Sequence, residues 1–261
     1  MHIEFNSMMK NIIKKIIQNS GYDIRKKGSF DTPSEFPSDF TESDIEIIKK
    51  VKPFTLTSNE RIHALLQATK YVIHNDVPGD IIECGVWRGG SMMAIAFTLL
   101  KEKKAEKDLY LFDTYEGMSK PTDLDVSFEG RKAVNQFEEN KKNEDSADWC
   151  FASCDEVKQN VMKTGYNTEK LHFIKGKVEN TLPEYAPKQI SLLRLDTDWY
   201  ESTKHELTHL FPRLVSGGVL ILDDYGYWAG AKKAVDEYFS QNKTQILLNR
   251  LDETGRIAIK I

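Results

Sequence analysis

Four aspartates stand directly after two apolar segments of the chain. Asp196 and Asp198 follow one segment, and Asp223 and Asp224 follow the other. Each segment is typical of a buried strand, and the parallel strands of an open α/β sheet deliver the residues at their carboxyl ends to one edge, where ligands bind. Crowded carboxylates repel one another unless they take up protons or hold a cation. Oxygen ligands favour Mg²⁺, so we predict a magnesium site here, although the residues alone leave manganese and calcium open.

A glycine-rich turn stands earlier in the chain, between an apolar run and a predicted helix. Gly85 follows the apolar residues 81–84, and Gly89 and Gly90 precede a helix expected to begin near Ser91. The N–H groups at a helix N-terminus attract anionic groups, and glycines let the backbone approach a ligand closely. The spacing is neither G-x-G-x-x-G nor a Walker A loop, so a tight turn without a ligand is an alternative interpretation.

A further acid ends the next apolar run. Asp113 follows residues 109–112. In nucleoside-binding α/β folds an acid at this position accepts hydrogen bonds from the ribose hydroxyls. Alone, Asp113 would equally suit a helix cap or a solvated strand end, but the glycine turn before it favours the nucleoside interpretation. The sequence therefore predicts a nucleoside cofactor and a cation in one crevice.

The segments that must position these residues alternate in character from Asp80 onward. Apolar runs predict strands and stretches of helical spacing predict helices between them, which is typical of a parallel sheet. The last two runs flank Asp-Glu-Thr-Gly, a turn signal that predicts an antiparallel hairpin. We expect an α/β fold with a seven-stranded, mostly parallel sheet and one reversed edge strand. The predicted strands are 81–84, 109–112, 171–174, 190–195, 218–222, 245–249 and 256–261, and the predicted helices are 91–103, 131–142, 153–164, 201–214 and 229–240.

The N-terminal residues predict helices and an extended arm. Residues 7–18 have the spacing of a short amphipathic helix, which suits packing on its own domain or on a second subunit better than a membrane surface. Residues 19–40 are rich in Gly, Ser, Pro and Asp and predict an extended arm. A helix through Val51 follows, and Ser58 is a plausible N-cap of a longer one. The long polar segment 114–130 comes directly after a strand and is a candidate lid or substrate loop.

Composition and charge narrow the class of protein. The chain has 261 residues and a formal net charge of −4, so no overall positive field favours nucleic acid. We find neither an apolar run long enough to span a membrane nor a signal-peptide pattern, and we expect a cytoplasmic protein. The three cysteines, Cys84, Cys150 and Cys154, indicate neither a disulfide framework nor a zinc set. His205 and His209 lie one helical turn apart but lack a third zinc ligand.

These motifs together give the chain a family resemblance. From about residue 50 to its end, the chain resembles the macrocin O-methyltransferase family, through residues 79–91, 111–118, 194–203 and 217–226. Members are S-adenosylmethionine- and magnesium-dependent enzymes that methylate sugar hydroxyls in antibiotic and glycan pathways. The resemblance implies a class I methyltransferase domain at 58–261, with a Rossmann-like sheet covered by helices on both faces. Residues 1–57 would form an N-terminal helical arm that serves as a lid or in oligomerisation.

The resemblance also implies roles for particular residues. The cofactor set would be Glu83, Gly85, Arg88 and Ser91 around the methionine part, Asp113 at the ribose, and Gly176, Lys177 and Val178 beside the adenine. The ligands of Mg²⁺ would be Asp196, Asp223 and Asp224. Family members commonly have Gly where Thr197 stands and a smaller apolar residue where Trp199 stands. Both positions touch the acceptor pocket, so they bear on the substrate more than on the reaction.

The implied reaction transfers a methyl group to a hydroxyl of a sugar or glycoside. Mg²⁺ would bind two neighbouring hydroxyls and lower the pKa of one, and Asp196 or Asp198 would take its proton. A metal-dependent glycosyltransferase is an alternative, because Asp196-x-Asp198 also suits a metal-bound nucleotide sugar. A cofactor-binding scaffold without activity is a second alternative, against which the intact acidic set argues. The apolar N-terminal helix predicts a homo-oligomer.

Overall fold

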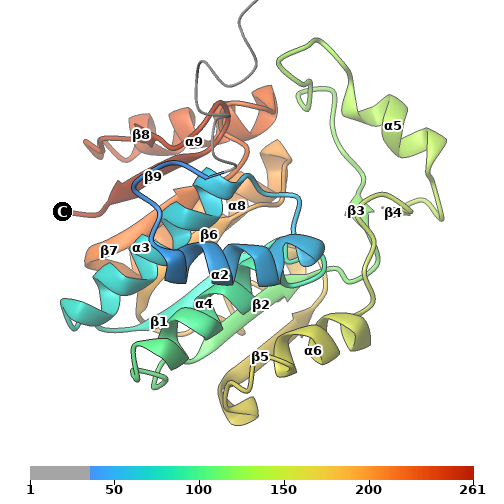
Figure 1. Ribbon diagram of the computed structural model, residues 1–261. Helices are drawn as coiled ribbons and strands as arrows, with labels where there is room; N and C mark the ends of the chain where they lie inside the picture. The colour runs from blue at the N-terminus through green and yellow to red at the C-terminus, as the bar shows by residue number, and fades with distance from the viewer. Residues whose placement is uncertain (1–35) are drawn as a thin grey trace, which may run out of the picture. The chain divides into compact units, whose positions relative to one another are not determined.

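The computed structural model describes residues 36–261, so the predicted helix at 7–18 and most of the predicted arm lie outside the described residues. The main sheet has seven strands in the order β5-β2-β1-β6-β7-β9-β8 (Figure 1). These strands are β1 (Asp80–Cys84), β2 (Leu109–Asp113), β5 (Leu171–Lys175), β6 (Ile190–Leu195), β7 (Leu214–Leu222), β8 (Asn249–Arg250) and β9 (Arg256–Ile259). The first five run parallel, and β9 is antiparallel to both its neighbours. The predicted sheet is confirmed.

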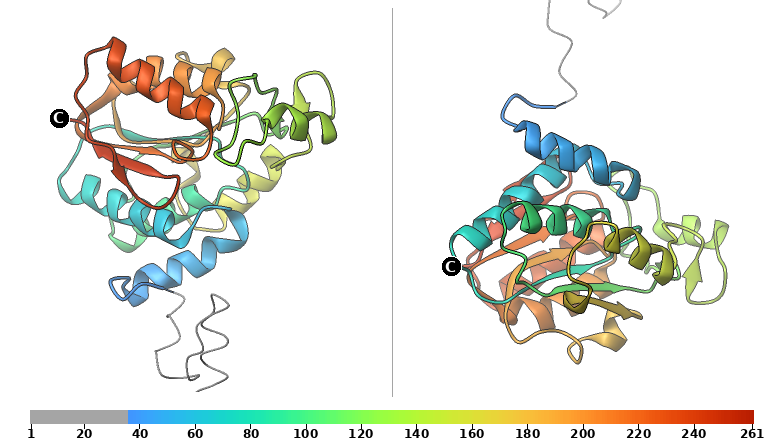
Figure 2. Two further views of the ribbon diagram at one scale, coloured as in Figure 1. Left: turned by 90° about the horizontal axis from the view of Figure 1, so that it is seen from above. Right: turned by 60° about the horizontal axis from the view of Figure 1, so that its bottom comes forward.

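Helices cover both faces of this sheet (Figure 2). The helices are α2 (Glu42–Val51), α3 (Asn59–His74), α4 (Gly90–Lys101), α5 (Ala133–Glu139), α6 (Cys154–Met162), α7 (Val178–Thr181), α8 (Tyr200–Leu210) and α9 (Ala229–Gln241), with the 3-10 helices η1 (Lys52–Phe54), η2 (Thr168–Lys170) and η3 (Phe211–Arg213). On one face α4 contacts α2, α3 and α6, and on the other α8 contacts α7 and α9. A parallel sheet covered in this way has strands that are buried throughout, as β6 is.

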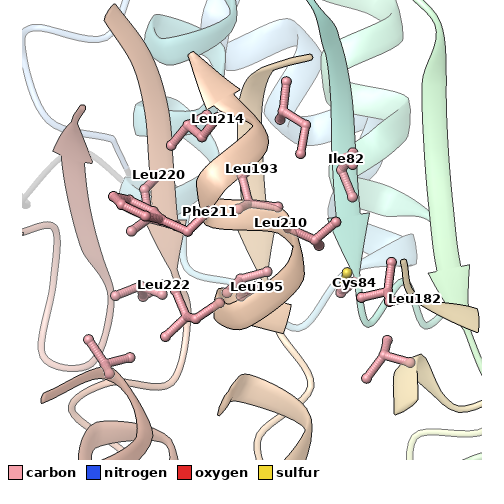
Figure 3. Packing of buried hydrophobic residues seen from close by; sticks show 14 of the residues in the cluster. Ile82, Cys84, Leu182, Leu193, Leu195, Leu210, Phe211, Leu214, Leu220 and Leu222 are labelled. Atoms are coloured by element: carbon pink, nitrogen blue, oxygen red, sulfur yellow. The ribbon is translucent and has the colours of Figure 1, made fainter. Parts of the chain in front are cut away.

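The packing of the sheet against α8 and α9 fixes the strand ends that matter for the site (Figure 3). Leu193, Leu195, Leu220 and Leu222 belong to one buried cluster that also includes residues of both helices. Fully burying a leucine side chain contributes about 1.5–3 kcal/mol, so this cluster holds β6 and β7 firmly. Leu195 pairs with Leu222 in the sheet register, and the acidic residues that follow the two strands therefore leave the sheet at the same level.

The helices before the sheet belong to the same compact unit, which spans Glu42–Ile261. The Ser58 hydroxyl accepts a hydrogen bond from the Arg61 N–H at 3.1 Å, which makes Ser58 the N-cap that the sequence predicts. The buried carboxylate of Asp44 on α2 pairs with Lys70 on α3 at 2.6 Å. α2 thus packs within this unit.

Several predicted elements are shorter in the structure. The first strand of the hairpin, expected over 245–249, is reduced to β8, because Ile246 and Leu248 pack against the core cluster instead of extending the ladder. The helix expected over 201–214 ends at Leu210, since Pro212 lies in η3 and cannot continue an α-helix. A separate two-stranded ladder joins β3 (Met118–Ser119) to β4 (Ser146–Ala147). In the described part of the chain, no helix combines the length and the apolar character needed to cross a membrane.

Candidate active site

A cavity of about 710 Å³ lies at the carboxyl ends of the parallel strands. Both predicted halves of the site, the glycine turn and the acidic residues, line it, as expected for the edge at which open α/β sheets bind ligands. The predicted residues in its lining are Glu83, Gly85, Ser91, Asp113, Gly176, Lys177, Val178, Asp196, Asp198, Asp223 and Asp224.

The glycine turn after β1 depends on two glycines with positive φ. Gly85 has φ +81°, and a Cβ added there would collide with the carbonyl oxygen of Asp196. Only glycine therefore fits where the turn after β1 meets the turn after β6. Gly89, with φ +90°, is the N-cap of α4, which begins at Gly90. The sequence predicted this strand-to-helix turn, and its backbone closes one side of the cavity.

Asp113 at the end of β2 holds the glycine turn in place. Its Oδ2 accepts hydrogen bonds from the N–H groups of Val86 at 2.7 Å and Trp87 at 3.1 Å, and its Oδ1 accepts from the Tyr115 N–H at 2.6 Å. Burial raises the pKa of the Asp113 carboxyl, and these backbone donors oppose that rise. The Thr114 hydroxyl also lies 3.4 Å from Oδ1, but its single proton is shared with the closer Gly117 carbonyl at 2.7 Å. A carboxylate oxygen can accept two hydrogen bonds, so Oδ1 keeps acceptor capacity.

Glu83 and Arg194 form a buried ion pair in the wall of the cavity. Arg194, which is 2% exposed, donates from Nη1 to Glu83 Oε1 at 2.5 Å. Burial raises the pKa of Glu83 to about 7, although Arg194 pulls it down. Among the described residues, Glu83 Oε2 has no hydrogen-bond partner. A buried carboxyl oxygen without a partner costs free energy, so this atom marks a place for a polar or cationic ligand group.

Three of the four predicted acids converge. Asp196, Asp198 and Asp224 each offer an oxygen, and these atoms lie within 4.8 Å of one another. Burial and mutual repulsion raise the pKa values of Asp196 and Asp224 well above their ordinary range, and that of Asp198 to about 7. Asp224 Oδ2 has no hydrogen-bond partner within the described part of the chain. Hard carboxylate oxygens at this spacing suit a divalent cation.

Asp223 stands apart from this group of three, although it also lines the cavity. Its Oδ1 accepts from Arg194 Nη2 at 2.6 Å, and its Oδ2 pairs with Arg61. Arg194 also donates to Asp196 Oδ2 at 2.7 Å and to the Thr57 hydroxyl at 3.0 Å. One guanidinium thus connects Glu83 on β1 with Asp196 and Asp223, which follow β6 and β7.

Arg88 is the one predicted site residue that is not in the cavity lining. Its Nε donates to Glu156 on α6 at 2.7 Å, and its Nη1 donates to the Pro53 carbonyl at 3.0 Å. Arg88 therefore ties the glycine turn to α6 and η1. Lys177 lines the cavity, but its ammonium group pairs with Asp145 at 2.7 Å.

The segment predicted as a lid forms a wall that is hydrogen-bonded to the core. The indole N–H of Trp199 donates to the Ser119 carbonyl at 3.0 Å, and the Tyr200 N–H donates to the Asp125 carboxylate at 2.8 Å. The Phe128 N–H donates to the Tyr227 carbonyl at 2.8 Å. These bonds connect residues 119–128 to the starts of α8 and α9.

An aromatic group beside the acids was not predicted as a group from the sequence. The ring centroids of Trp149, Trp199 and Trp228 lie 5.1–6.2 Å apart, and Trp149 and Trp228 line the cavity together with Tyr227 and Phe128. Each tryptophan comes from a different segment, so only the fold brings them together. Their one visible signal in the sequence was Trp199, in a position where the resemblance implies a smaller residue.

The chain matches a model of the macrocin-O-methyltransferase (TylF) family over residues 7–258. It belongs to this family. Demethyldecarbamoylnovobiocin O-methyltransferase of Streptomyces niveus is 32% identical over 201 residues, 77% of this chain and 73% of the relative. The 8-demethyl-8-(2,3-dimethoxy-alpha-L-rhamnosyl)-tetracenomycin-C 4'-O-methyltransferase of Streptomyces olivaceus is 29% identical over 201 residues, 77% of this chain and 73% of the relative. The structure of the O-methyltransferase NovP has a TM-score of 0.67 and 29% identity, covering 79% of this chain and 82% of NovP.

Membership of the macrocin-O-methyltransferase family establishes the class of reaction. The protein is an S-adenosylmethionine-dependent O-methyltransferase, and its sheet is that of a class I methyltransferase. The alternative interpretation of Asp196-x-Asp198 as a glycosyltransferase motif is not supported, because the matching family and these relatives are methyltransferases.

Proposed function

We propose that this enzyme methylates a hydroxyl of a sugar or glycoside, with S-adenosylmethionine as the donor and Mg²⁺ as a bound cation. The name of the tetracenomycin relative, which includes a rhamnosyl group, supports the choice of acceptor. The observation that carries the proposal is the convergence of Asp196, Asp198 and Asp224 in the cavity that Glu83 also lines. One cavity can then present a donor and a coordinated hydroxyl to each other.

The cofactor would occupy the side of the cavity formed by β1 and β2. Glu83 Oε2, buried and without a partner among the described residues, suits the ammonium group of the methionine part. Asp113 Oδ1 has the capacity to accept one ribose hydroxyl while Oδ2 keeps its two backbone donors. Gly176 and Val178 line the cavity beyond β2, where the adenine would lie.

The cation would be held by Asp196 and Asp224, which follow neighbouring strands. Asp224 Oδ2 is unpartnered within the described residues, and the Asp196 carboxylate is oriented by Arg194. Asp223, the third predicted ligand, could join them only by exchanging an arginine for the ion. When bound, Mg²⁺ supplies positive charge that lowers the pKa of a hydroxyl placed on it.

Asp198 is the residue best placed to accept the proton. The Asp196 carboxylate accepts a hydrogen bond from Arg194 and would hold the cation, whereas burial raises the pKa of the Asp198 carboxyl to about 7. A base with a pKa near the working pH is efficient. As Asp198 takes the hydroxyl proton, the acceptor oxygen forms a bond to the methyl carbon and the carbon–sulfur bond breaks. The rigid walls of the cavity align these atoms and keep water out.

The proposal is tested with a methyl-labelled donor, Mg²⁺ and a panel of sugars and deoxysugar glycosides. We expect label in a methyl ether for at least one acceptor, loss of transfer when EDTA removes the cation, and S-adenosylhomocysteine binding by calorimetry under both conditions. Transfer that continues in EDTA would refute the requirement for a bound cation. Binding of S-adenosylhomocysteine with no transfer to any glycoside, but with transfer to phenolic acceptors, would refute the sugar.

A further inference from the structure

We propose that Glu206 and Thr197 form a positioning pair for the acidic turn, which we define as residues 196–199. The Thr197 hydroxyl donates a hydrogen bond to Glu206 Oε1 at 2.9 Å. Thr197 stands between the two acids of the turn, and Glu206 lies on α8 behind it. The inference rests on the function proposed above, because it concerns how the site holds Asp196 and Asp198.

The burial of Glu206 is the first argument. Glu206 is 0% exposed, and its Oε2 has no hydrogen-bond partner in the described part of the chain. Neighbouring Leu207 on the same helix belongs to the core cluster, so packing alone would favour an apolar side chain here. A buried carboxyl costs free energy unless it is hydrogen-bonded. The Cys84 side chain also lies beside this carboxyl, and the hydrogen bond from the Thr197 hydroxyl ties it to the acidic turn.

The backbone of the acidic turn is the second argument. Asp198 has φ +69°, in the left-handed region that residues other than glycine rarely adopt. The turn is anchored at its first residue, where the Asp196 N–H donates to the Cys84 carbonyl at 2.9 Å. It is anchored at its last residue by the buried ring of Trp199. Strained backbone persists only where its surroundings hold it, and Thr197 is the residue between these anchors.

The structure of α8 supplies the third argument. The Ser202 hydroxyl shares its proton between the carbonyls of Thr197 at 3.3 Å and Trp199 at 3.2 Å, so α8 contacts both the main chain of the acidic turn and the side chain of Thr197. α8 is itself fixed by the core cluster through Leu207 and Leu210. Glu206 therefore transmits the rigid position of the helix to the turn. Without the side-chain contact, Asp198 would sample orientations that do not face Asp224.

The test uses pairs of variants that differ in a single group. Thr197→Val removes the hydroxyl and keeps the shape, whereas Thr197→Ser keeps the hydroxyl. Glu206→Leu removes the acceptor, whereas Glu206→Gln retains an acceptor oxygen. The matched control is Thr208→Val, which removes a hydroxyl on the same helix that donates to the Lys204 carbonyl at 2.7 Å, away from the cavity. Mn²⁺ affinity by electron paramagnetic resonance and S-adenosylhomocysteine affinity by calorimetry are measured for each.

We expect Thr197→Val and Glu206→Leu to weaken Mn²⁺ binding about fivefold, the factor typical of one lost hydrogen bond, and to lower kcat by a similar factor. S-Adenosylhomocysteine affinity should stay unchanged, and Thr197→Ser, Glu206→Gln and Thr208→Val should match the wild type. The double variant Thr197→Val/Glu206→Leu should lose no more than either single variant, because both remove one contact.

Two results would overturn the positioning role. One is a Thr197→Val enzyme with wild-type Mn²⁺ affinity and kcat. The other is a Glu206→Gln enzyme as impaired as Glu206→Leu. If Glu206→Leu fails to fold, the isosteric Thr197→Val variant still decides. Failure of the proposed function gives a different pattern, in which the wild type binds S-adenosylhomocysteine but neither binds Mn²⁺ nor methylates a glycoside.

Discussion

Two turns meet in this site, and they are built in opposite ways. The glycine turn after β1 is shaped by backbone, with Gly85 in the left-handed region and two N–H groups bound to Asp113. The acidic turn after β6 contains no glycine and is held by side chains, among them Glu206 and Trp199. A turn that contains glycines can adopt its conformation through its own backbone. A turn without glycine must be held by side-chain contacts from other elements of the fold. The donor side is therefore encoded locally, and the acidic side is encoded by the whole fold.

The sharpest way to separate the two turns is to remove one charge from the acidic turn. We expect Asp198→Asn to lower kcat by about 10²–10⁴, the contribution of a general base, because the amide cannot accept the hydroxyl proton. S-Adenosylhomocysteine affinity should not change, since the donor side has its own supports. The measurements are initial rates with saturating donor and calorimetry. A variant that keeps a tenth of the activity would exclude Asp198 as the base.

The contrast between the turns also explains what the sequence could predict. The glycine turn, Asp113 and the strand at 190–195 were predicted with their positions, because glycine conformations and apolar runs are local properties. The edge on which the four aspartates lie was predicted for the same reason. Whether each aspartate faces a neighbour carboxylate or an arginine is not a local property. It depends on Arg61, which reaches Asp223 from a helix far back in the chain.

The rest of the site required the structure. Trp149, Trp199 and Trp228 come from three segments whose meeting no periodicity indicates. Glu206 looks like an ordinary polar residue of an amphipathic helix, yet it is buried. The strand expected over 245–249 forms only at Asn249–Arg250, because Ile246 and Leu248 pack against the core cluster and do not pair with β9. In each case, contacts between segments that are distant in the sequence decide the outcome, and the local sequence pattern does not.

The point where the turns touch gives the second prediction. We expect Gly85→Ala to destabilise the protein by about 3 kcal/mol, from left-handed strain together with the collision at the Asp196 carbonyl. S-Adenosylhomocysteine affinity should fall as well, because both turns must shift. Gly130→Ala is the matched control: Gly130 has φ +82° but nothing within 4 Å of an added Cβ, so only about 1 kcal/mol of strain is expected. Urea unfolding of both variants measures the difference, and equal losses would refute the close contact.

The acidic residues after β6 and β7 should make stability depend on pH and on the cation. The pKa values of Asp196, Asp198 and Asp224 are raised in the folded state, so their protonated forms favour folding. That contribution is present at low pH and is lost as the pH rises from the ordinary aspartate value through about 7 for Asp198. Melting temperatures without Mg²⁺ should therefore fall between pH 6 and pH 8.

A bound cation would offset the repulsion among these carboxylates, as protonation does at low pH. At about 100 times its Kd, Mg²⁺ should stabilise the folded state by about 2.7 kcal/mol, and the gain should be larger at pH 8 than at pH 6 because protons compete less. Asp224→Asn should abolish most of this gain, while the stabilisation by S-adenosylhomocysteine should remain. A rise in melting temperature with Mg²⁺ that is equal at both pH values would contradict the idea that protons and cation share one site.

The smallest expected effect concerns Arg88, on the outer side of the glycine turn. If the backbone builds the donor side, removing this side chain should leave S-adenosylhomocysteine affinity within a factor of about two, and the partly exposed pair with Glu156 should contribute at most about 1 kcal/mol to stability. Arg88→Ala, compared with Glu156→Ala, measures both quantities by calorimetry and urea unfolding. A tenfold loss of affinity in Arg88→Ala alone would mean that this guanidinium contributes to cofactor binding.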